Sequence, residues 1–209
     1  MNRQRIVEVA TGYFLKHGFS KVTTDDIANE LGMSKKTLYK HFPTKEDILR
    51  EAVQVQMHEW TIRTAFLNDP AIKVIEKLRR LMALVATQYS TMSRTFLEDI
   101  RRNAPHIWKE INEWRSTYIL TAFRRFYHEG VEQGVFRTDI PDHLAVMIYA
   151  TTIQQMVNPD RVTELPYSAV DICNAVMKIF YEGVLTGAGR EEMKLIKPDL
   201  GVAGIAFPA

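Results

Sequence analysis

The stretch from Thr24 to Lys45 constrains the fold of this chain more than any other. It has the pattern of two short helices joined by a tight turn, with Thr24 suited to the N-cap of the first helix. Gly32 stands where a glycine in the left-handed conformation commonly ends a helix. Ser34 then suits the N-cap of a second helix, which must end before Pro43 because proline excludes a further helical turn. The stretch therefore predicts a helix-turn-helix.

The second of these helices has an apolar and a basic side. At about 100° per residue, Leu38 and Phe42 point one way while Lys36 and Lys40 point the other. The segment 33–45 holds four lysines and no acidic residue. A helix of this size fits a DNA major groove about 12 Å wide, where lysines bind phosphates and polar side chains read base edges. The predicted DNA-contacting residues are Thr24, Ser34, Lys35, Lys36, Thr37, Tyr39, Lys40, His41 and Lys45.

The same stretch carries a recognisable family pattern, formed by Thr24, Ile27, Ala28, Leu31, Gly32, Ser34, Thr37, Leu38, Tyr39, His41, Phe42, Lys45 and Glu46. It resembles the helix-turn-helix signature of TetR-type transcriptional regulators. The resemblance is specific over residues 3 to 50 and only architectural beyond them. Lys36 departs from the pattern, because the family commonly has a glycine or another small residue there. We expect the backbone approach at that point to be altered and Lys36 to add a phosphate or guanine contact.

Charge is distributed unevenly along the 209 residues, although the formal net charge is only +2. Residues 1–50 hold nine basic and six acidic side chains, a net charge of +3, and the remainder has a net charge of −1. This is the split expected of a basic DNA-contacting module on a nearly neutral body. At 46% apolar residues, that body can bury a sizeable core.

The single cysteine, Cys173, excludes an internal disulfide framework and a cysteine-rich zinc site. The N-terminus has no apolar region of the signal-peptide kind, and no apolar run approaches the roughly 18 residues of a membrane span. We therefore expect a soluble cytoplasmic protein.

Helical periodicity continues along the chain, with no hairpin signal and no glycine-rich phosphate loop. The first helix is expected over 2–17, and a fourth begins at Lys45 and runs to about Leu67. Prolines near helix starts and glycines near helix ends bound the rest. The later helices are expected at 71–90, 92–103, 105–132, 141–157 and 167–186. The fold class is thus all-α with about nine helices, like the TetR-type fold.

We divide the chain into three regions. Residues 1–50 form the helix-turn-helix domain, and residues 51–188 form a helical ligand-binding and dimerisation domain. Residues 189–209 form a tail whose glycines and prolines argue against a long helix, although its last ten residues are free of charged side chains.

Large apolar side chains recur at helical spacing in the second domain. Most belong to an ordinary core, but the resemblance implies a small-molecule pocket among the middle helices, and such pockets are mostly apolar with a few polar anchors. The mixture of Trp, Tyr and Met favours an aromatic or lipophilic ligand. The candidate lining is Trp60, Met82, Tyr89, Phe96, Trp114, Tyr118 and Tyr149, with Gln88 or Arg115 as polar anchors.

The last two helices are the predicted dimer interface. Two helices from each subunit would make a four-helix interface about a two-fold axis, an arrangement that the resemblance implies. A dimer would let two recognition helices read a palindrome. The residues predicted to form the interface are Leu144, Ile148, Thr151, Val176, Phe180 and Val184.

Catalytic and metal-binding patterns are weak in this chain. His106, His128 and His143 lie on separate expected helices without an H-E-x-x-H arrangement, so we predict neither a metal nor a cofactor. No nucleophile–base pairing is indicated, and we expect no enzyme.

The sequence leaves two regulators in competition. The first is a homodimeric repressor that binds a palindromic operator and is released by a small lipophilic ligand. The second is an architectural or adaptor DNA-binding protein of the same fold, controlled by protein partners. The effector, the operator, the sign of regulation and the role of the tail stay open.

Overall fold

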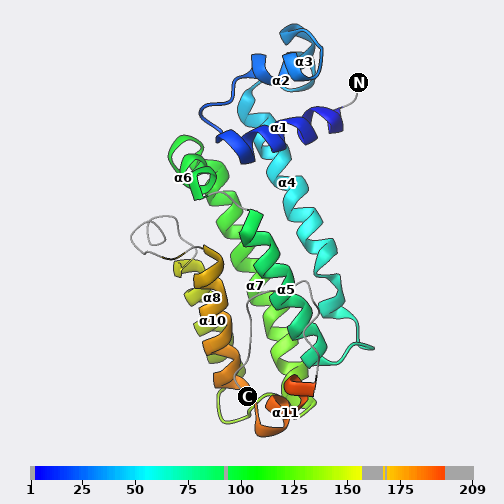
Figure 1. Ribbon diagram of the computed structural model, residues 1–209, viewed down its shortest axis with the longest axis vertical. Coiled ribbons are helices and arrows are strands. Elements are labelled where there is room, and N and C mark those ends of the chain that lie inside the picture. The colour runs from blue at the N-terminus through cyan, green and yellow to red at the C-terminus, as the bar shows by residue number, and fades with distance from the viewer. Residues whose placement is uncertain (1–2, 92–93, 157–166, 168, 196–209) are drawn as a thin grey trace. The chain divides into compact units, whose positions relative to one another are not determined.

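The computed structural model describes residues 3–91, 94–156, 167 and 169–195. Within these ranges the chain is all-α, as predicted, apart from one isolated antiparallel bridge between Phe136 and Leu185 (Figure 1). None of the helices there is long and apolar enough to cross a membrane. The helices are α1 (Arg3–His17), α2 (Thr24–Glu30), α3 (Lys35–His41), α4 (Lys45–Arg63), α5 (Val74–Thr91), α6 (Arg94–Asn103), α7 (Pro105–Glu132), α8 (Asp142–Met156), α10 (Ala169–Val184) and α11 (Gly187–Leu195), with a 3-10 turn, η1 (Ala65–Asn68), after α4.

The chain forms two compact units. The first unit comprises residues 1–63 and 92–113, and the second unit comprises residues 64–91 and 114–209. This division differs from the predicted one at residue 50, because α6 and the beginning of α7 belong to the same unit as the helix-turn-helix. Helix α7 therefore contributes to both units.

A single apolar core holds the first unit together. Ile6, Ala10 and Phe14 of α1 are buried in it, at the spacing of one face of a helix. Ile100 of α6 and Ile107 of α7 are fully buried in the same cluster. Full burial of a large aliphatic side chain stabilises the folded state by about 1.5–3 kcal/mol, so α6 is an integral part of this unit.

The helix-turn-helix shows the predicted turn and one shifted boundary. The N-cap of α2 is Thr23 rather than Thr24: Thr23 Oγ1 accepts from the Asp26 N–H at 3.1 Å, and Asp26 Oδ2 accepts from the Thr23 N–H at 2.8 Å. This reciprocal capping box prevails because Asp26 lies three residues after Thr23. Gly32 has φ of +62°, and the Met33 N–H donates to Ala28 O at 2.9 Å, which confirms the left-handed helix end.

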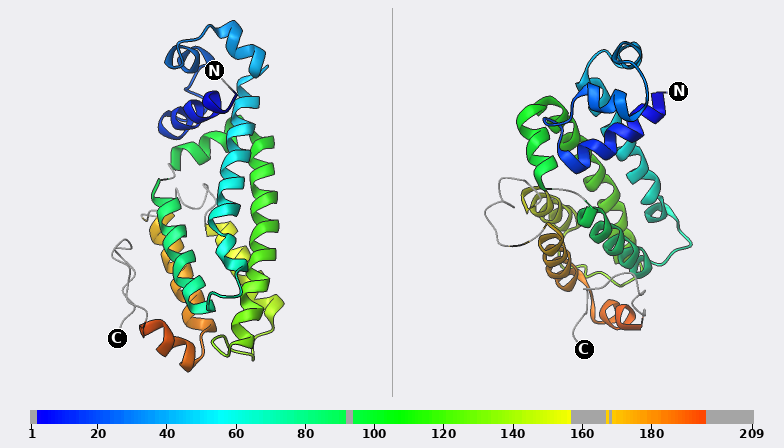
Figure 2. Two further views of the ribbon diagram at one scale, coloured as in Figure 1. Left: turned by 90° about the vertical axis from the view of Figure 1, so that its right-hand side faces the viewer. Right: turned by 45° about the horizontal axis from the view of Figure 1, so that its top comes forward.

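The second unit is a helical layer rich in aromatic side chains. Helix α10 packs against both α5 and α8, and the right-hand view of Figure 2 shows α8 and α10 side by side. Phe123 of α7 stacks on Tyr149 of α8 with ring centroids 4.2 Å apart, and Phe180 of α10 meets both rings. These contacts form the aromatic cluster, Phe123, Tyr149, Phe180 and Tyr181.

Two expected boundaries change in this region. Helix α4 ends at Arg63 rather than near Leu67, because hydrogen bonds such as Leu67 N–H to Thr64 O turn the backbone into η1. Helix α11 lies where the sequence predicted tail. Its Gly189 approaches the Val135 carbonyl so closely that a Cβ atom would lie 2.4 Å from that oxygen, so glycine here serves packing. The apolar end of the tail, 196–209, lies outside the described residues.

Candidate nucleic-acid interface

Helix α3 has one buried and one exposed side. Leu38 and Phe42 have no exposed surface and anchor α3 to the core of the first unit. Ser34 caps the helix, since its Oγ accepts from the Thr37 N–H at 3.1 Å. The exposed residues on the other side form the α3 surface: Ser34, Lys35, Lys36, Thr37, Tyr39 and Lys40. Six of the nine predicted DNA-contacting residues thus lie together, and their contact with DNA stays a prediction.

The lysines of the α3 surface differ in their partners. Lys35 Nζ lies 2.7 Å from Asp25 Oδ2, and this hydrogen bond raises the pKa of Lys35. Lys36 and Lys40 form no ion pair with any residue in the described part of the chain. Because their positive charge is unshared within the described residues, Lys36 and Lys40 are better candidates than Lys35 for a phosphate or base contact, which stays a prediction.

Two hydroxyl groups meet beside the α3 surface at the start of α2. Thr24 Oγ1 lies 3.3 Å from the Tyr39 hydroxyl, and Tyr39 is 41% exposed. Hydroxyls at a helix N-terminus are suitable donors to a phosphate, because the first backbone N–H groups there also attract anions. Thr24 therefore adjoins the α3 surface through Tyr39, and its contact with DNA stays a prediction.

Arg3 holds the C-terminal end of α3, a role that the sequence analysis missed. Its Nη1 donates to His41 O at 2.9 Å, its Nη2 donates to Glu51 Oε2 at 2.7 Å, and its guanidinium lies 4.1 Å from the centre of the Phe42 ring. The last carbonyls of a helix need donors from outside the helix. His41 therefore contributes its backbone to a structural contact, while its side chain is half-buried.

Lys45 has structural partners in the first unit, and its predicted contact with a phosphate stays a prediction. Its Nζ donates to Phe19 O and Val22 O, each at 2.9 Å, and lies 4.3 Å from the centre of the Phe19 ring. Burial lowers the pKa of Lys45, and the negative charge of Asp99 opposes that shift. The position of Lys45 at a helix start could not reveal these carbonyls, which lie 23 and 26 residues earlier.

The predicted ligand-lining residues are divided between the two units. Trp60 and Phe96 belong to the first unit, where Phe96 packs against the core. In the second unit Met82 and Tyr149 are buried, Arg115 is half-buried, and Trp114 stacks on Tyr118, whose hydroxyl bonds to Thr64 Oγ1. The side chains of Gln88 and Tyr89 lie outside the described residues. The nine predicted residues therefore do not form one group within either unit.

Tyr181 is a buried polar residue that the prediction omitted. Its side chain is fully buried in the aromatic cluster, and its hydroxyl, which lies near that of Tyr149, forms no hydrogen bond of good geometry with the described residues. Burial raises the pKa of Tyr181 well above its ordinary value, with a further contribution from Tyr149. The Tyr149 hydroxyl donates to Met177 Sδ at 3.1 Å. Met177 and Tyr181 lie one helical turn apart in the sequence, and this spacing was the available signal that both side chains lie on the same buried face of α10.

The predicted dimer residues fall into exposed and buried groups. On α8, Leu144, Ile148 and Thr151 are exposed, and Met147 between them is 53% exposed. On α10 the prediction needs correction: Val176 and Val184 are buried inside the second unit, and Phe180 is half-buried against Phe123. Ile179, 75% exposed, marks the outer side of α10 instead. The α8–α10 surface is defined here as Leu144, Met147, Ile148, Thr151 and Ile179.

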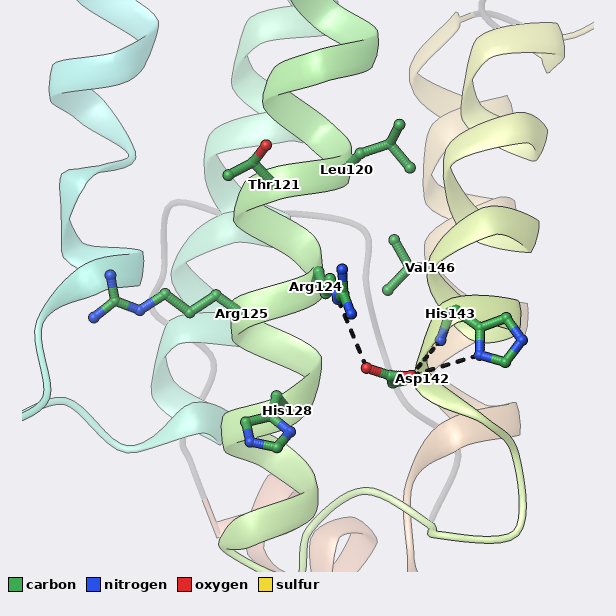
Figure 3. A pocket seen from close by; sticks show the side chains of 8 residues that line it. All are labelled: Leu120, Thr121, Arg124, Arg125, His128, Asp142, His143 and Val146. Carbon is green, nitrogen blue, oxygen red and sulfur yellow. Dashed lines mark hydrogen bonds and ion pairs between the residues drawn. The ribbon is translucent and has the colours of Figure 1, made fainter.

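An open groove of about 740 Å³ lies between α7 and α8 (Figure 3). Leu120 and Val146 give it apolar walls, and Arg124 and His143 lie on either side of Asp142. Arg124 Nε is 3.8 Å and His143 Nδ1 is 3.7 Å from the Asp142 carboxylate. The other two histidines considered as metal ligands also have carboxylate neighbours, His106 with Glu46 and His128 with Glu132.

Comparison with known proteins adds a family and a fold. Residues 6–52 match the N-terminal domain of the tetR family of bacterial regulatory proteins. The fatty acid metabolism regulator protein of Bacillus subtilis is 23% identical over 184 residues, which cover 86% of this chain and 94% of that protein. The transcriptional repressor KstR2 of Rhodococcus jostii is 27% identical over 162 residues, covering 68% and 72%. A solved structure of the regulator FadR from Bacillus subtilis in complex with stearoyl-CoA has a TM-score of 0.61 at 22% identity, covering 87% and 99%.

Proposed function

This chain belongs to the TetR family of DNA-binding transcriptional regulators, and we propose that it is a homodimeric repressor. In this proposal it binds a near-palindromic operator through the α3 surface. A small lipophilic ligand in the second unit then releases it from DNA.

The α3 surface is the observation that carries the proposal. Leu38 and Phe42 fix the helix from below, so that the lysines and hydroxyls on its other side have a rigid support. Lys36 and Lys40 supply positive charge, and Thr37 and Tyr39 supply groups that can read bases or bind phosphates. This arrangement suits the second helix of a helix-turn-helix, which enters the major groove.

The α8–α10 surface supports a dimer. Ile148 and Ile179 are 55% and 75% exposed, and large aliphatic side chains lose contact with water when a partner covers them. A two-fold dimer doubles the number of bases that α3 can read and makes the operator a palindrome.

The aromatic cluster supports a lipophilic ligand. A buried hydroxyl without a partner costs about 1–3 kcal/mol, so a ligand that accepts a hydrogen bond from Tyr181 would be stabilised there. The regulators similar to this chain include one of fatty acid metabolism and one solved with stearoyl-CoA. The apolar side chains around Tyr181 are chemically compatible with an acyl chain. Such a ligand would act by binding more tightly to the conformation that has low DNA affinity.

Selection of bound DNA from a random pool tests the DNA-binding part of the proposal. Enrichment of a palindrome by the purified protein at physiological salt is expected. On that DNA, Lys36→Ala with Lys40→Ala should lower the affinity at least tenfold and reduce the slope of log K against log salt by about 2, because two phosphate-contacting charges are lost. Lys109→Ala removes a 76%-exposed lysine from α7 of the same unit and serves as the control. An unchanged affinity and salt slope in the double variant would show that the α3 surface is not the DNA contact.

A ligand titration tests the release. Stearoyl-CoA, stearate and free coenzyme A should be added separately to the protein–DNA complex, with the midpoint of thermal unfolding measured in parallel. Release and stabilisation by an acylated compound but not by free coenzyme A would support an acyl-chain ligand, and Tyr181→Phe should weaken that response. If no lipophilic compound has either effect, the alternative regulator controlled by protein partners is favoured.

A further inference from the structure

The loop between α1 and α2, residues 18–23, is held by side chains of two helices that follow the helix-turn-helix. Asp99 Oδ2 of α6 accepts from the Ser20 N–H at 2.7 Å. Lys45 Nζ of α4 donates to the carbonyls of Phe19 and Val22, each at 2.9 Å. Three backbone groups of one short loop are therefore fixed by side chains that lie 23 to 79 residues later in the chain.

The Asp99 carboxylate has little freedom in this position. The residue is only 9% exposed, and its other oxygen, Oδ1, accepts from Asn103 Nδ2 at 2.6 Å. Gly18 has φ of +87°, and a Cβ atom on it would lie 2.7 Å from Asp99 Oδ2. The loop and the carboxylate thus approach each other so closely at Gly18 that any other residue there would displace one of them.

The helix that carries Asp99 is itself fixed. Ile100, next to Asp99, has no exposed surface, and Ala104 between α6 and α7 is equally buried in the core of the first unit. Because a hydrogen bond weakens steeply beyond about 3.2 Å, the backbone of Ser20 must follow the position of this carboxylate closely.

The held loop ends at the N-cap of α2. Thr23 forms the capping box with Asp26, and Thr24 directly after it carries the hydroxyl that meets Tyr39 on α3. A displacement of the loop would therefore change the start of α2 and the pair of hydroxyls beside the α3 surface.

We propose that Asp99 and Lys45 are positioning residues of the DNA interface. Asp99 holds an N–H group of the α1–α2 loop and Lys45 holds two of its carbonyls, and together these contacts set the positions of α2 and α3. The proposal rests on the DNA binding proposed above. Neither residue needs to touch DNA, and Asp99 gives α6 a direct influence on operator affinity.

The test compares Asp99→Ala, Asp99→Asn and the control Glu98→Ala, which removes a carboxylate from the neighbouring position of α6. Operator affinity and its salt dependence are measured on the selected DNA, with exchange of the Ser20 amide proton measured by NMR. Asp99→Ala should lower operator affinity about tenfold or more and accelerate Ser20 exchange, because the amide loses its acceptor. The salt slope should stay unchanged, since no phosphate contact is removed.

Asp99→Asn keeps an oxygen that can accept from Ser20, so it should retain most of the affinity and the slow exchange. Lys45→Met, which keeps the aliphatic stem and loses the donors, should lower affinity as Asp99→Ala does. Circular dichroism and unfolding midpoints establish that each variant is folded at the temperature of the binding measurement.

Three outcomes would overturn the proposal. The first is folded Asp99→Ala that binds operator within twofold of the natural protein, and the second is an equal loss in Glu98→Ala. The third is a reduced salt slope in Lys45→Met, which would mean that Lys45 binds a phosphate. Failure of the natural protein to bind any selected DNA would instead count against the proposed function.

Discussion

Each unit of this protein has a lysine removed in part or in full from solvent, half-buried Lys45 in the first unit and buried Lys77 in the second, and the two lysines have different kinds of partner. In the first unit, Lys45 is held by two backbone carbonyls of the α1–α2 loop. In the second unit, Lys77 is only 1% exposed and is held by Glu129, whose two carboxylate oxygens lie 2.8 and 2.6 Å from its Nζ. Carbonyl partners fix a segment of backbone, whereas a carboxylate partner neutralises the buried charge. The comparison indicates that Lys45 positions a segment of backbone beside the proposed DNA interface, whereas Lys77 and Glu129 stabilise the interior of the second unit.

The largest effect is expected from breaking the ion pair of the second unit. Lys77→Ala removes the cationic partner of the Glu129 carboxylate and leaves it the amide of Gln133 as a donor, and removal of one member of a buried pair typically costs about 3–5 kcal/mol. The free energy of unfolding, measured in urea, should fall by that amount. Lys73→Ala is the control, because its ion pair with Glu192 involves a lysine side chain that is 78% exposed. A loss below about 1 kcal/mol in Lys77→Ala would contradict the stabilising role of the pair.

Two glycines offer the same substitution with opposite expected results. Gly130 in α7 packs under Phe136, and a Cβ atom there would lie 2.1 Å from the ring, whereas a Cβ at Gly12 in α1 meets nothing within 4 Å. Gly130→Ala should destabilise the protein by about 1–3 kcal/mol through overpacking. Gly12→Ala should stabilise it by about 0.5–1 kcal/mol, because alanine favours a helix. Thermal unfolding of both variants measures this difference, and equal shifts in one direction would be inconsistent with it.

The contribution of Glu76 on α5 to the stability of the protein should depend on pH. Hydrogen bonds from Arg79, with further contributions from Arg80, lower the pKa of Glu76 from 4.5 to about 2. Since the folded pKa lies below the unfolded one, this stabilisation is present above pH 4.5 and is lost as the pH falls toward 2. Allowing for partial exposure, we expect a loss of about 1–2 kcal/mol over that range.

Unfolding of Glu76→Gln between pH 5 and 2 measures this contribution, because that variant should lack it. Glu113→Gln serves as a control, since its ion pair with Lys109 has both side chains at least 66% exposed. An unaltered pH dependence in Glu76→Gln would contradict the lowered pKa.

The smallest loss of stability is expected at the cap of α2. Thr23→Ala removes the side-chain acceptor of the Asp26 N–H and should cost about 1 kcal/mol of stability. Thr23→Ser keeps the hydroxyl and should restore the cap. If contacts at the α1–α2 loop position the proposed DNA interface, Thr23→Ala should also reduce operator affinity. Its loss of binding free energy should exceed its loss of folding free energy, because the cap adjoins the Thr24–Tyr39 pair. Loss of stability without loss of affinity would separate the cap from the DNA interface.

Local sequence signals determined much of the first unit. The turn at Gly32, the cap at Ser34 and the burial of Leu38 and Phe42 depend on residues within one or two helical turns of each other, so they could be read from the chain. The same signals predicted α3 and its basic side. The cap of α2 lies one residue before the predicted one, which shows how precise these local signals are. Thr23 and Thr24 are both acceptable caps, and only the reciprocal bond with Asp26 distinguishes them.

The sequence by itself thus determined an all-α chain, a helix-turn-helix and the residues of the α3 surface. The tertiary structure alone decided which side of α10 is exposed, since Val176 and Ile179 are equally apolar and differ only in what packs against them. It also decided that Lys45 and Asp99 hold one loop, and that Tyr181 lies inside an aromatic core. The physical reason is that helical periodicity is encoded over a few residues, whereas burial and partner choice arise from contacts between segments tens of residues apart.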